Sequence, residues 1–406
     1  MAAQSQPHPL RSLTHTLKPS PASLKLLRKP STLIVAAKSN PHPNLGGRKL
    51  RVAVIGGGPA GSSAAESLAR GGVETFLFER SPAAAKPCGG AIPLCMLDEF
   101  DIPSHLVDRK VTHMKIISPS NLTVDFGKTL KPHEFISMLR REVLDSYLRS
   151  RAESNGAVSI KALVTSLEVP SSPHAPYLVH YTVDNSTQKP LAVDCVVGAD
   201  GANSKVAKSI HAGNYACAIA FQERIRLPDH KMEYYNNLAE MYVGNDVSPD
   251  FYAWVFPKCD HVAVGTGTLR SKHDIKLLQS GIRARVLPKI EGGKVIKVEA
   301  HPIPEHPRPI RVRGRVALVG DAAGFLDLLQ KVFYGSNAAR EALVELCGDE
   351  YVQRMTFESY LYKKLATGNP WEDLKMLSST IGSLVRSNLV GREMEVFNQS
   401  VLAKVR

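Results

Sequence analysis

A glycine-rich loop constrains this 406-residue sequence more than any other feature, because it lies between a β-branched run and a run of small residues. Residues 49–55 (KLRVAVI) lead into Gly56–Gly61 (GGGPAG), which residues 62–70 (SSAAESLAR) and residues 73–79 (VETFLFE) follow. The first and last segments have the composition of buried strands, and the third has helical spacing. We therefore expect a strand, a glycine loop, a helix and a second strand, the opening unit of a parallel α/β sheet.

Each glycine of the loop has a physical role in a nucleotide site. Gly56 permits the tight turn, Gly58 lets the backbone approach a pyrophosphate, and Gly61 lets the helix pack on the strand. The helix N-terminus then faces the phosphates, and Glu79 can accept hydrogen bonds from ribose hydroxyls. A glycine turn used only for packing is the alternative, and the loop alone does not distinguish FAD from NAD(P). The expected nucleotide site consists of Gly56, Gly58, Pro59, Ala60, Gly61, Glu79 and Arg80.

Two later segments end apolar strands in acidic turns. Residues 192–204 (AVDCVVGADGANS) contain one such turn, and residues 315–324 (RVALVGDAAG) contain the other. Taken singly, each could be an ordinary exit from a strand. Together, and in this order behind the glycine loop, they resemble the flavoprotein hydroxylase and reductase superfamily. That resemblance implies FAD, with Asp321 on the ribityl chain and Asp200 near the flavin and the entering nicotinamide. It adds Asp200, Gly201, Gly320, Asp321 and Gly324 to the expected FAD site.

A basic helix between these turns also fits the superfamily. Residues 140–148 (RREVLDSYL) match its R-x-x-F/L-D-x-x-L pattern, beginning at Arg141. The resemblance implies that Arg141 reaches the pyrophosphate. The alternative is one more cation on a solvated helix face.

Two further motifs narrow the resemblance. Pro249–Pro257 (PDFYAWVFP) matches the P-x-x-Y-x-W-x-F-P signature of geranylgeranyl reductases at every fixed position, and Lys86–Gly90 (KPCGG) resembles their cysteine-glycine loop. Residues 260–268 and 301–309 are similar to the plastid members of that family. The sequence thus resembles the plant plastid geranylgeranyl diphosphate (geranylgeranyl-chlorophyll) reductases over nearly all of residues 50–400. Gly89 and Gly90 join the expected cofactor site.

Three aromatic residues of the signature also have a reading from physical chemistry. Tyr252, Trp254 and Phe256 alternate, so on a strand they face one side together and can wall an apolar tunnel for a C20 substrate chain. The alternative is a core stripe, since aromatic strands are normally buried.

The family resemblance implies a reaction as well as a site. NADPH supplies the electrons, through FAD, that saturate isolated double bonds of a geranylgeranyl chain three times over, giving the phytyl form used in chlorophyll and tocopherol biosynthesis. An isolated trisubstituted alkene accepts hydride poorly, so one carbon is protonated while the other becomes cationic, and aromatic faces can stabilise that cation. Cys88 is the candidate catalytic proton donor, with a packed loop cysteine as the alternative.

Periodicity outside the motifs predicts the remaining structure. Val111–Ile117, His261–Gly265 and Lys294–Val298 alternate as strands do, whereas Arg340–Cys347 and Ser378–Val385 have helical spacing. The fold class is therefore α/β. The expected parts are a Rossmann-like, three-layer FAD-binding domain with a mostly parallel sheet over residues 49–105, 131–205 and 312–326, an inserted antiparallel substrate-binding sheet over residues 106–130 and 206–311, and a helical C-terminal region over residues 327–406.

The first 48 residues differ from the rest in composition. Residues 1–50 contain eight Lys or Arg and no acidic residue, so the net charge of +13 falls to +5 without them, too mild for a nucleic-acid partner. Residues 1–48 are rich in Ser and Thr and lack an apolar core, which is typical of a plastid transit peptide. A mitochondrial leader or a disordered tail is the alternative. Six scattered cysteines give no metal-ligand pattern, and no apolar run is long enough to span a membrane, so we expect peripheral membrane contact.

The sequence departs from the family after Gly324. The family has a loop there, then a Gly-x-Gly-Ile helix whose N-terminus meets the flavin, and then roughly fifty residues of helical chain. Here residues 325–334 (FLDLLQKVFY) follow at once. Loss of that helix is expected to weaken FAD binding or abolish turnover.

Two other functions stay open at this point. An FAD-dependent monooxygenase of an apolar substrate would share the flavin motifs, and a catalytically impaired, truncated relative would act as a binding module. The resemblance also implies partners, namely chlorophyll synthase and a light-harvesting-like membrane anchor, at thylakoid or envelope membranes.

Overall fold

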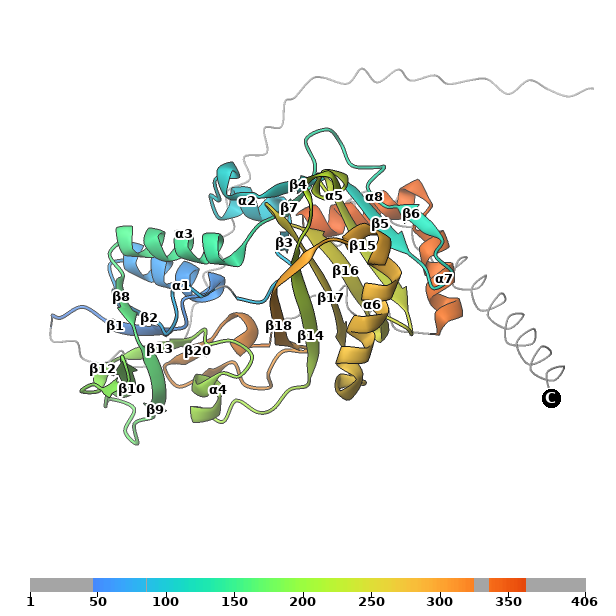
Figure 1. Cartoon of the computed structure of the whole chain (residues 1–406). Coiled ribbons are helices and arrows are strands. Elements are labelled where there is room, and N and C mark those ends of the chain that lie inside the picture. Colours follow the sequence, from blue (N-terminus) through green and yellow to red (C-terminus); the bar gives the residue numbers. More distant parts are fainter. Residues whose placement is uncertain (1–46, 85, 325–335, 363–406) are drawn as a thin grey trace, which may run out of the picture. The chain divides into compact units, whose positions relative to one another are not determined.

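The computed structural model describes residues 47–84, 86–324 and 336–362, which Figure 1 draws in colour. All but the last two residues of the expected transit peptide lie outside the described residues, as does the expected helix at Ser378–Val385. Among the described residues, no helix combines the length and the apolar character that crossing a membrane requires.

A six-stranded sheet is built from the segments that carry the glycine loop and the two acidic turns. Its central strand β1 (Arg51–Ile55) pairs in parallel with β2 (Glu74–Glu79) and with β13 (Cys195–Gly198). The pairing is parallel because helix α1 (Pro59–Arg70) returns the chain from the end of β1 to the start of β2. The strand order is β19 (Val312–Arg313), β20 (Val316–Leu318), β13, β1, β2 and β8 (Val158–Lys161), with β19 antiparallel at one edge.

Two helices cover one face of this sheet. Helices α1 and α3 (Arg141–Ser154) lie side by side there (Figure 1). Val52 and Leu77 of the strands pack with Ala65 of α1 and Ala152 of α3. The small alanines let both helices approach the sheet closely, which places the start of α1 directly above the glycine loop.

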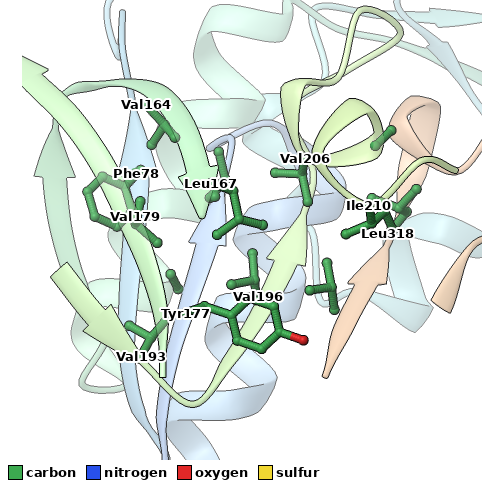
Figure 2. Packing of buried hydrophobic residues seen from close by; sticks show 14 of the residues in the cluster. Phe78, Val164, Leu167, Tyr177, Val179, Val193, Val196, Val206, Ile210 and Leu318 are labelled. Carbon is green, nitrogen blue, oxygen red and sulfur yellow. The ribbon is translucent and has the colours of Figure 1, made fainter. Parts of the chain in front are cut away.

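A smaller sheet and helix α4 (Lys205–Ser209) cover the opposite face. Figure 2 shows this core, in which Phe78 and Val196 of the parallel sheet meet Val179 of the small sheet and Ile210 behind α4. Helices, parallel sheet and second sheet form three layers, which confirms the expected Rossmann-like α/β fold. The small sheet contains β11 (Ser186–Thr187), β10 (Tyr177–Val183), β12 (Leu191–Val193) and β9 (Leu163–Glu168).

A three-stranded sheet follows the cysteine-glycine loop. Strand β7 (Ile136–Met138) lies between β3 (Ala91–Ile92) and β4 (Arg109–Val111). The Leu139 N–H donates to the Gly90 carbonyl (3.0 Å), so the end of the loop is tied to the end of β7. Helix α2 (Cys95–Glu99) and the 3₁₀ turn Ser104–Leu106 connect β3 to β4.

The seven-stranded sheet is antiparallel, as expected, except at one pair. Strand β5 (His113–Ile117) lies parallel to β15 (Leu238–Gly244), because a long crossover rather than a hairpin joins them. The segment Val111–Ile117, expected as one strand, is divided at Thr112 because β4 and β5 belong to different sheets. The order is β18 (Lys294–Pro304), β14 (Cys217–Arg226), β17 (His261–Thr268), β16 (Ser248–Pro257), β15, β5 and β6 (Thr123–Asp125).

The two faces of the seven-stranded sheet have different neighbours. Helix α6 (Ile275–Ile290) packs on one face, where Val255 and Val264 meet Ile282. The other face carries the aromatic residues of β16 and the residues that pair with them across the sheet, and we call it the aromatic face. It comprises Tyr252, Trp254 and Phe256 of β16, Gly265 of β17, Gln222 and Arg224 of β14, and Glu299 and His301 of β18.

Two later helices are α7 (Asn337–Leu346), which packs on β15 and β6, and α8 (Glu350–Tyr362), whose Gln353 donates to the Asp125 carbonyl of β6. Val344 and Phe357 join the core that also contains Trp254. The helix expected at Arg340–Cys347 is confirmed, although it begins three residues earlier. The grouping of all these elements into the domains expected from the sequence stays a prediction.

Candidate functional site

The glycine loop brings the backbone closer together than any side chain would allow. Gly56 has a φ of +108°, and a Cβ on Gly61 would collide with the carbonyl oxygen of Gly56. Gly58 is the N-cap of α1 and makes no side-chain capping hydrogen bond, and Pro59 stands in the first turn. The start of α1 therefore presents backbone N–H groups and the positive end of the helix dipole, as a phosphate requires.

Glu79 braces this loop from the end of β2. Its buried carboxylate accepts hydrogen bonds from the N–H groups of Gly57 (2.9 Å) and Ser81 (2.9 Å). Burial alone would raise the pKa of Glu79, but these hydrogen bonds and the nearby Lys86 lower it below the usual value. Glu79 is thus ionised and fixed beside the loop, and its role toward a ribose stays a prediction. The neighbouring Arg80 is exposed.

Two arginines of α3 reach the glycine loop. Arg141 Nη2 lies 3.6 Å from the place that a Cβ on Gly58 would occupy, and Asp145 holds the Arg141 guanidinium through two hydrogen bonds (2.8 and 2.9 Å). Burial opposes the charge of Arg141, but Asp145 and the neighbouring Cys88 raise its pKa above the usual value. Arg149 donates to the Gly57 carbonyl (2.9 Å), a contact that the sequence did not indicate.

The first acidic turn lies against the glycine loop by its backbone. A Cβ on Gly56 would collide with the carbonyl oxygen of Ala199, which leaves no space between the two motifs. The Asp200 carboxylate accepts hydrogen bonds from the Ser204 hydroxyl (2.5 Å) and the Lys205 N–H (2.6 Å), so it caps helix α4. Gly201 has a φ of +80°. Both Asp200 oxygens already have partners within the chain. A role of Asp200 toward a flavin or nicotinamide stays a prediction.

The second acidic turn closes the same region from the other side. Gly320 has a φ of +57°, and a Cβ at this position would stand 2.9 Å from the Cβ of Ala60 in α1. The Asp321 carboxylate is half-exposed, and one of its oxygens lies 3.8 Å from His301 Nε2 on the aromatic face. Gly324 packs against the backbone of His306, so its glycine is required by close packing as well.

The cysteine-glycine loop connects the cofactor motifs to the aromatic face. The half-buried Cys88 lies beside Arg141, and its Sγ accepts a hydrogen bond from the Gly90 N–H (3.3 Å). A Cβ on Gly89 would stand 2.9 Å from Phe256 Cδ2, so the loop rests directly on that ring. The expected Cys88 loop and the expected aromatic strand therefore meet.

The three alternating aromatic side chains of β16 do face one side together. The ring centroids of Tyr252 and Trp254 are 5.9 Å apart, and those of Trp254 and Phe256 are 6.2 Å apart. Gly265 opposite Trp254 leaves the space that the indole fills, since a Cβ there would stand 2.5 Å from Trp254 Cζ2. This arrangement supports the expected substrate wall, which stays a prediction.

The aromatic face touches the cofactor segments at three separate places. Each contact joins one strand of the seven-stranded sheet to one element of the expected FAD site. The first contact is the Phe256 ring against Gly89. In the second, Arg224 Nη1 lies 3.3 Å from Glu142 Oε1, and Glu142 is next to Arg141 in the sequence. In the third, His301 Nε2 lies 3.8 Å from Asp321 Oδ2. A molecule bound on the aromatic face would therefore lie next to a cofactor held by the glycine loop.

The site residues fit the parts of FAD. The uncapped start of α1 and the Arg141 guanidinium converge at Gly58, where a pyrophosphate needs donors and positive charge. Glu79 and Asp321 are the carboxylates expected to meet the ribose and ribityl hydroxyls, and these roles stay predictions. Residues 49–218 match the family described as FAD binding domain. The fold and this cradle define a flavoprotein of the FAD-binding type.

Sequence relatives make the assignment more specific. Residues 218–301 match the geranylgeranyl reductase catalytic domain. The chain is 57% identical to the chloroplastic geranylgeranyl diphosphate reductase of Nicotiana tabacum, over 89% of this chain and 91% of that protein. It is 55% identical to the chloroplastic protein of Arabidopsis thaliana (92% and 93%) and 54% identical to the Synechocystis protein (84% and 98%). The chain belongs to the geranylgeranyl reductase family.

Solved structures share the fold at low sequence identity. A geranylgeranyl bacteriochlorophyll reductase-like protein from Thermoplasma acidophilum is 20% identical, with a TM-score of 0.59 over 84% of this chain and 88% of that one. The flavin-dependent halogenase CmlS is also 20% identical, with a TM-score of 0.55 over 77% of this chain and 60% of that one. These structures support the flavoprotein fold alone.

The alignment with the tobacco relative also bears on the segment after Gly324. It extends over 424 positions, whereas 89% of a 406-residue chain is about 361 residues, so about 63 aligned positions have no counterpart here. This difference has the size of the loop, helix and following segment that the sequence indicated as missing. Residues 325–335 lie outside the described residues.

One buried charged residue at the candidate site escaped the sequence analysis although it directly follows the signature strand. Lys258 is 3% exposed, and its ammonium donates hydrogen bonds to the carbonyls of Gly89 and Leu139 (3.1 Å to Leu139). Burial lowers the pKa of Lys258 to about 8, although Cys88 and Asp108 act in the opposite direction. A lysine at the end of a strand is ordinarily solvated, so only the structure identifies this one.

Proposed function

We propose that this chain is an FAD-dependent reductase that uses NADPH to saturate isolated double bonds of a geranylgeranyl chain, carried by a diphosphate or by chlorophyll. The observation that carries the proposal is the contact of the aromatic face with the cofactor segments at Gly89, Glu142 and Asp321. The family membership supports the substrate class, since the relatives are named for geranylgeranyl diphosphate.

The aromatic face binds and orients the prenyl chain in this proposal. Tyr252, Trp254 and Phe256 offer ring faces that exclude water and stabilise positive charge developing on a tertiary carbon. FAD, when bound and reduced, supplies the hydride. Asp321 and Arg141 hold the cofactor from two sides, so its position relative to the aromatic face is set by the sheet contacts.

Cys88 donates the proton that the alkene needs. Its thiol lies in the loop that rests on Phe256, and the loop is fixed by the Lys258 ammonium. Cys88→Ser is expected to slow turnover of geranylgeranyl diphosphate at least tenfold without loss of bound flavin. Cys217→Ser, at the first residue of β14, is the control, and unchanged turnover in Cys88→Ser contradicts this role.

The decisive experiment incubates the purified holoprotein anaerobically with NADPH and geranylgeranyl diphosphate and follows product mass. We expect stepwise gain of two hydrogens at each of three double bonds, with NADPH consumed in equal amount. Product containing oxygen in air, and none under anaerobic conditions, would instead identify a monooxygenase. The same assay with geranylgeranyl-chlorophyll determines which carrier is preferred.

A second candidate function is a catalytically impaired binding module, which the about 63 unmatched positions of the tobacco alignment favour. The absorption spectrum of desalted protein, expressed from about residue 48, distinguishes the two. Retained flavin absorption shows that the cofactor site closes without the missing segment. A folded but colourless protein would leave prenyl binding as the remaining role.

The same resemblance leads us to place the protein in plastids, peripherally at thylakoid or envelope membranes. The plant relatives are named as chloroplastic. Chlorophyll synthase and a light-harvesting-like membrane anchor are the partners that we propose. Co-sedimentation with plastid membranes that contain or lack the anchor tests this, and equal sedimentation in both argues against the anchor.

A further inference from the structure

Lys258 is a buried, charged side chain whose hydrogen-bond partners are all neutral. A residue that only filled space would not need the charge. Its ammonium donates to two backbone carbonyls, those of Gly89 and Leu139. Among the described residues, no carboxylate lies within ion-pair distance of Lys258. A buried ammonium without an anionic partner is costly, whereas an uncharged side chain of the same length would fill the space at less cost.

The surroundings of Lys258 show what the charge can act on. Gly90 is required beside it, because a Cβ on Gly90 would overlap the Lys258 ammonium. Gly90 in turn donates its N–H to Cys88 Sγ (3.3 Å). The ammonium therefore holds both glycines of the loop that presents Cys88.

Cys88 lies near two cations from different elements. One is Arg141 of α3, and the other is Lys258, which follows β16. The titratable and charged groups that face Lys258 are Asp108 before β4, Glu142 of α3, Arg224 of β14, His261 of β17 and the Cys88 thiol. Asp108 is already paired with Arg140 (3.1 Å), and Glu142 is already paired with Arg224 (3.3 Å). A negative charge on the Cys88 sulfur would therefore be the one that the unpaired Lys258 ammonium stabilises.

We propose that Lys258 is a positioning residue for Cys88. It fixes the Cys88–Gly90 loop against Phe256 and stabilises the sulfur after Cys88 has lost its proton, whereas Arg141 is already paired with Asp145. The inference rests on the proposed function in giving Cys88 a proton to donate. In that step the S–H bond breaks, a C–H bond forms at one alkene carbon, and the electron pair stays on Sγ near the Lys258 ammonium. The other alkene carbon receives the hydride that reduced flavin supplies, and a proton from solvent restores the thiol.

The test measures alkylation of Cys88 in the resting holoprotein, without prenyl substrate. Iodoacetamide is added between pH 6 and 10, and peptide mass spectrometry follows Cys88 with Cys217 as the internal reference. We expect Lys258→Met to slow Cys88 alkylation about tenfold at pH 7.5, because the sulfur loses a neighbouring positive charge. Cys217 should react as before, and Lys110→Met, which changes an exposed lysine, should leave both cysteines unaffected.

Lys258→Gln separates charge from anchoring, because its amide keeps two N–H donors for the Gly89 and Leu139 carbonyls. We expect the same slower alkylation in Lys258→Gln, with flavin content and melting temperature close to those of the wild type. Cys88 alkylation that is unchanged or faster in both folded variants overturns the proposal. The assay needs no reductase activity, so a wild-type protein that fails to reduce geranylgeranyl diphosphate refutes the proposed function independently of this result.

Discussion

The two faces of the seven-stranded sheet are made by the same strands, yet they bury different chemistry. Toward α6, the central side chains of β16 and β17 are aliphatic, as at Val255 and Val264. On the aromatic face, Gln222 Oε1 and Trp254 Nε1 are buried, and neither atom has a hydrogen-bond partner among the described residues. An unpaired buried polar atom costs about 1–3 kcal/mol. One face thus contributes stability, and the other gives stability up where a ligand would bind.

The largest expected effect is on the α6 face. Ile282→Ala removes a fully buried side chain and leaves a cavity, so the free energy of unfolding should fall by about 2–5 kcal/mol. Urea unfolding measures this, and Ile282→Val, which removes one methylene, should cost about 1 kcal/mol. Flavin content and turnover of the folded protein should not change. Loss of turnover at unchanged stability would show that the α6 face also belongs to the site.

The next effect concerns pH at the edge of the aromatic face. The pKa of Lys258 is about 8 in the folded chain, below its usual 10.5, so between these values the unfolded chain binds more protons. The free energy of unfolding should therefore rise with pH in this window, by up to about 3 kcal/mol relative to Lys258→Met. Unfolding titrations of both proteins at pH 7.5 to 10.5 measure the difference. Parallel pH curves would contradict it.

A smaller effect is expected at the polar part of the aromatic face. Glu299 accepts hydrogen bonds from Gln222 (2.9 Å) and Arg224 (3.0 Å). Burial alone would raise the pKa of Glu299, but Lys297 and these partners lower it below the usual value. Glu299→Gln should cost about 2 kcal/mol at pH 7. The difference should disappear as the pH falls through the folded-state pKa, where wild-type Glu299 is protonated as well. A difference that persists in acid would contradict the ionised state.

The smallest effect on stability is expected at Trp254. Because the indole N–H is buried without a partner, Trp254→Phe should change the free energy of unfolding by less than about 1 kcal/mol. Turnover of geranylgeranyl diphosphate should nevertheless fall about tenfold, since the aromatic face loses surface that would contact the prenyl chain. Met241→Leu, in the same row of the sheet, is the control for repacking. A strongly destabilised Trp254→Phe with normal turnover would show that Trp254 is a core residue.

The sequence predicted those parts of the site in which neighbouring residues depend on one another. The glycine loop and the acidic turns require particular residues at fixed short spacings, and these spacings are visible in the sequence. Lys258 is separated from Gly89 by 169 positions in the sequence, and Arg149 is separated from Gly57 by 92. No local sequence pattern therefore predicts either contact. The break at Thr112 was missed for the same reason, because only the partners of β4 and β5 separate them. Asp200 is the opposite case, since the Ser204 hydroxyl and the Lys205 N–H that it binds lie only four and five positions further along the chain.

The strands of the seven-stranded sheet lie earlier in the sequence than the last strands of the parallel sheet, and this fixes the order in which the two are synthesised. Because the last strands of the seven-stranded sheet end at Pro304, that sheet is complete on the ribosome before β20 of the parallel sheet and the Gly320-Asp321 turn have emerged. Domains fold as their residues become available, so the nascent chain holds a finished aromatic face before its cofactor site can close. Val344 and Phe357, which join the core around Trp254, are also made after the sheet, so that core stays open until helices α7 and α8 have emerged.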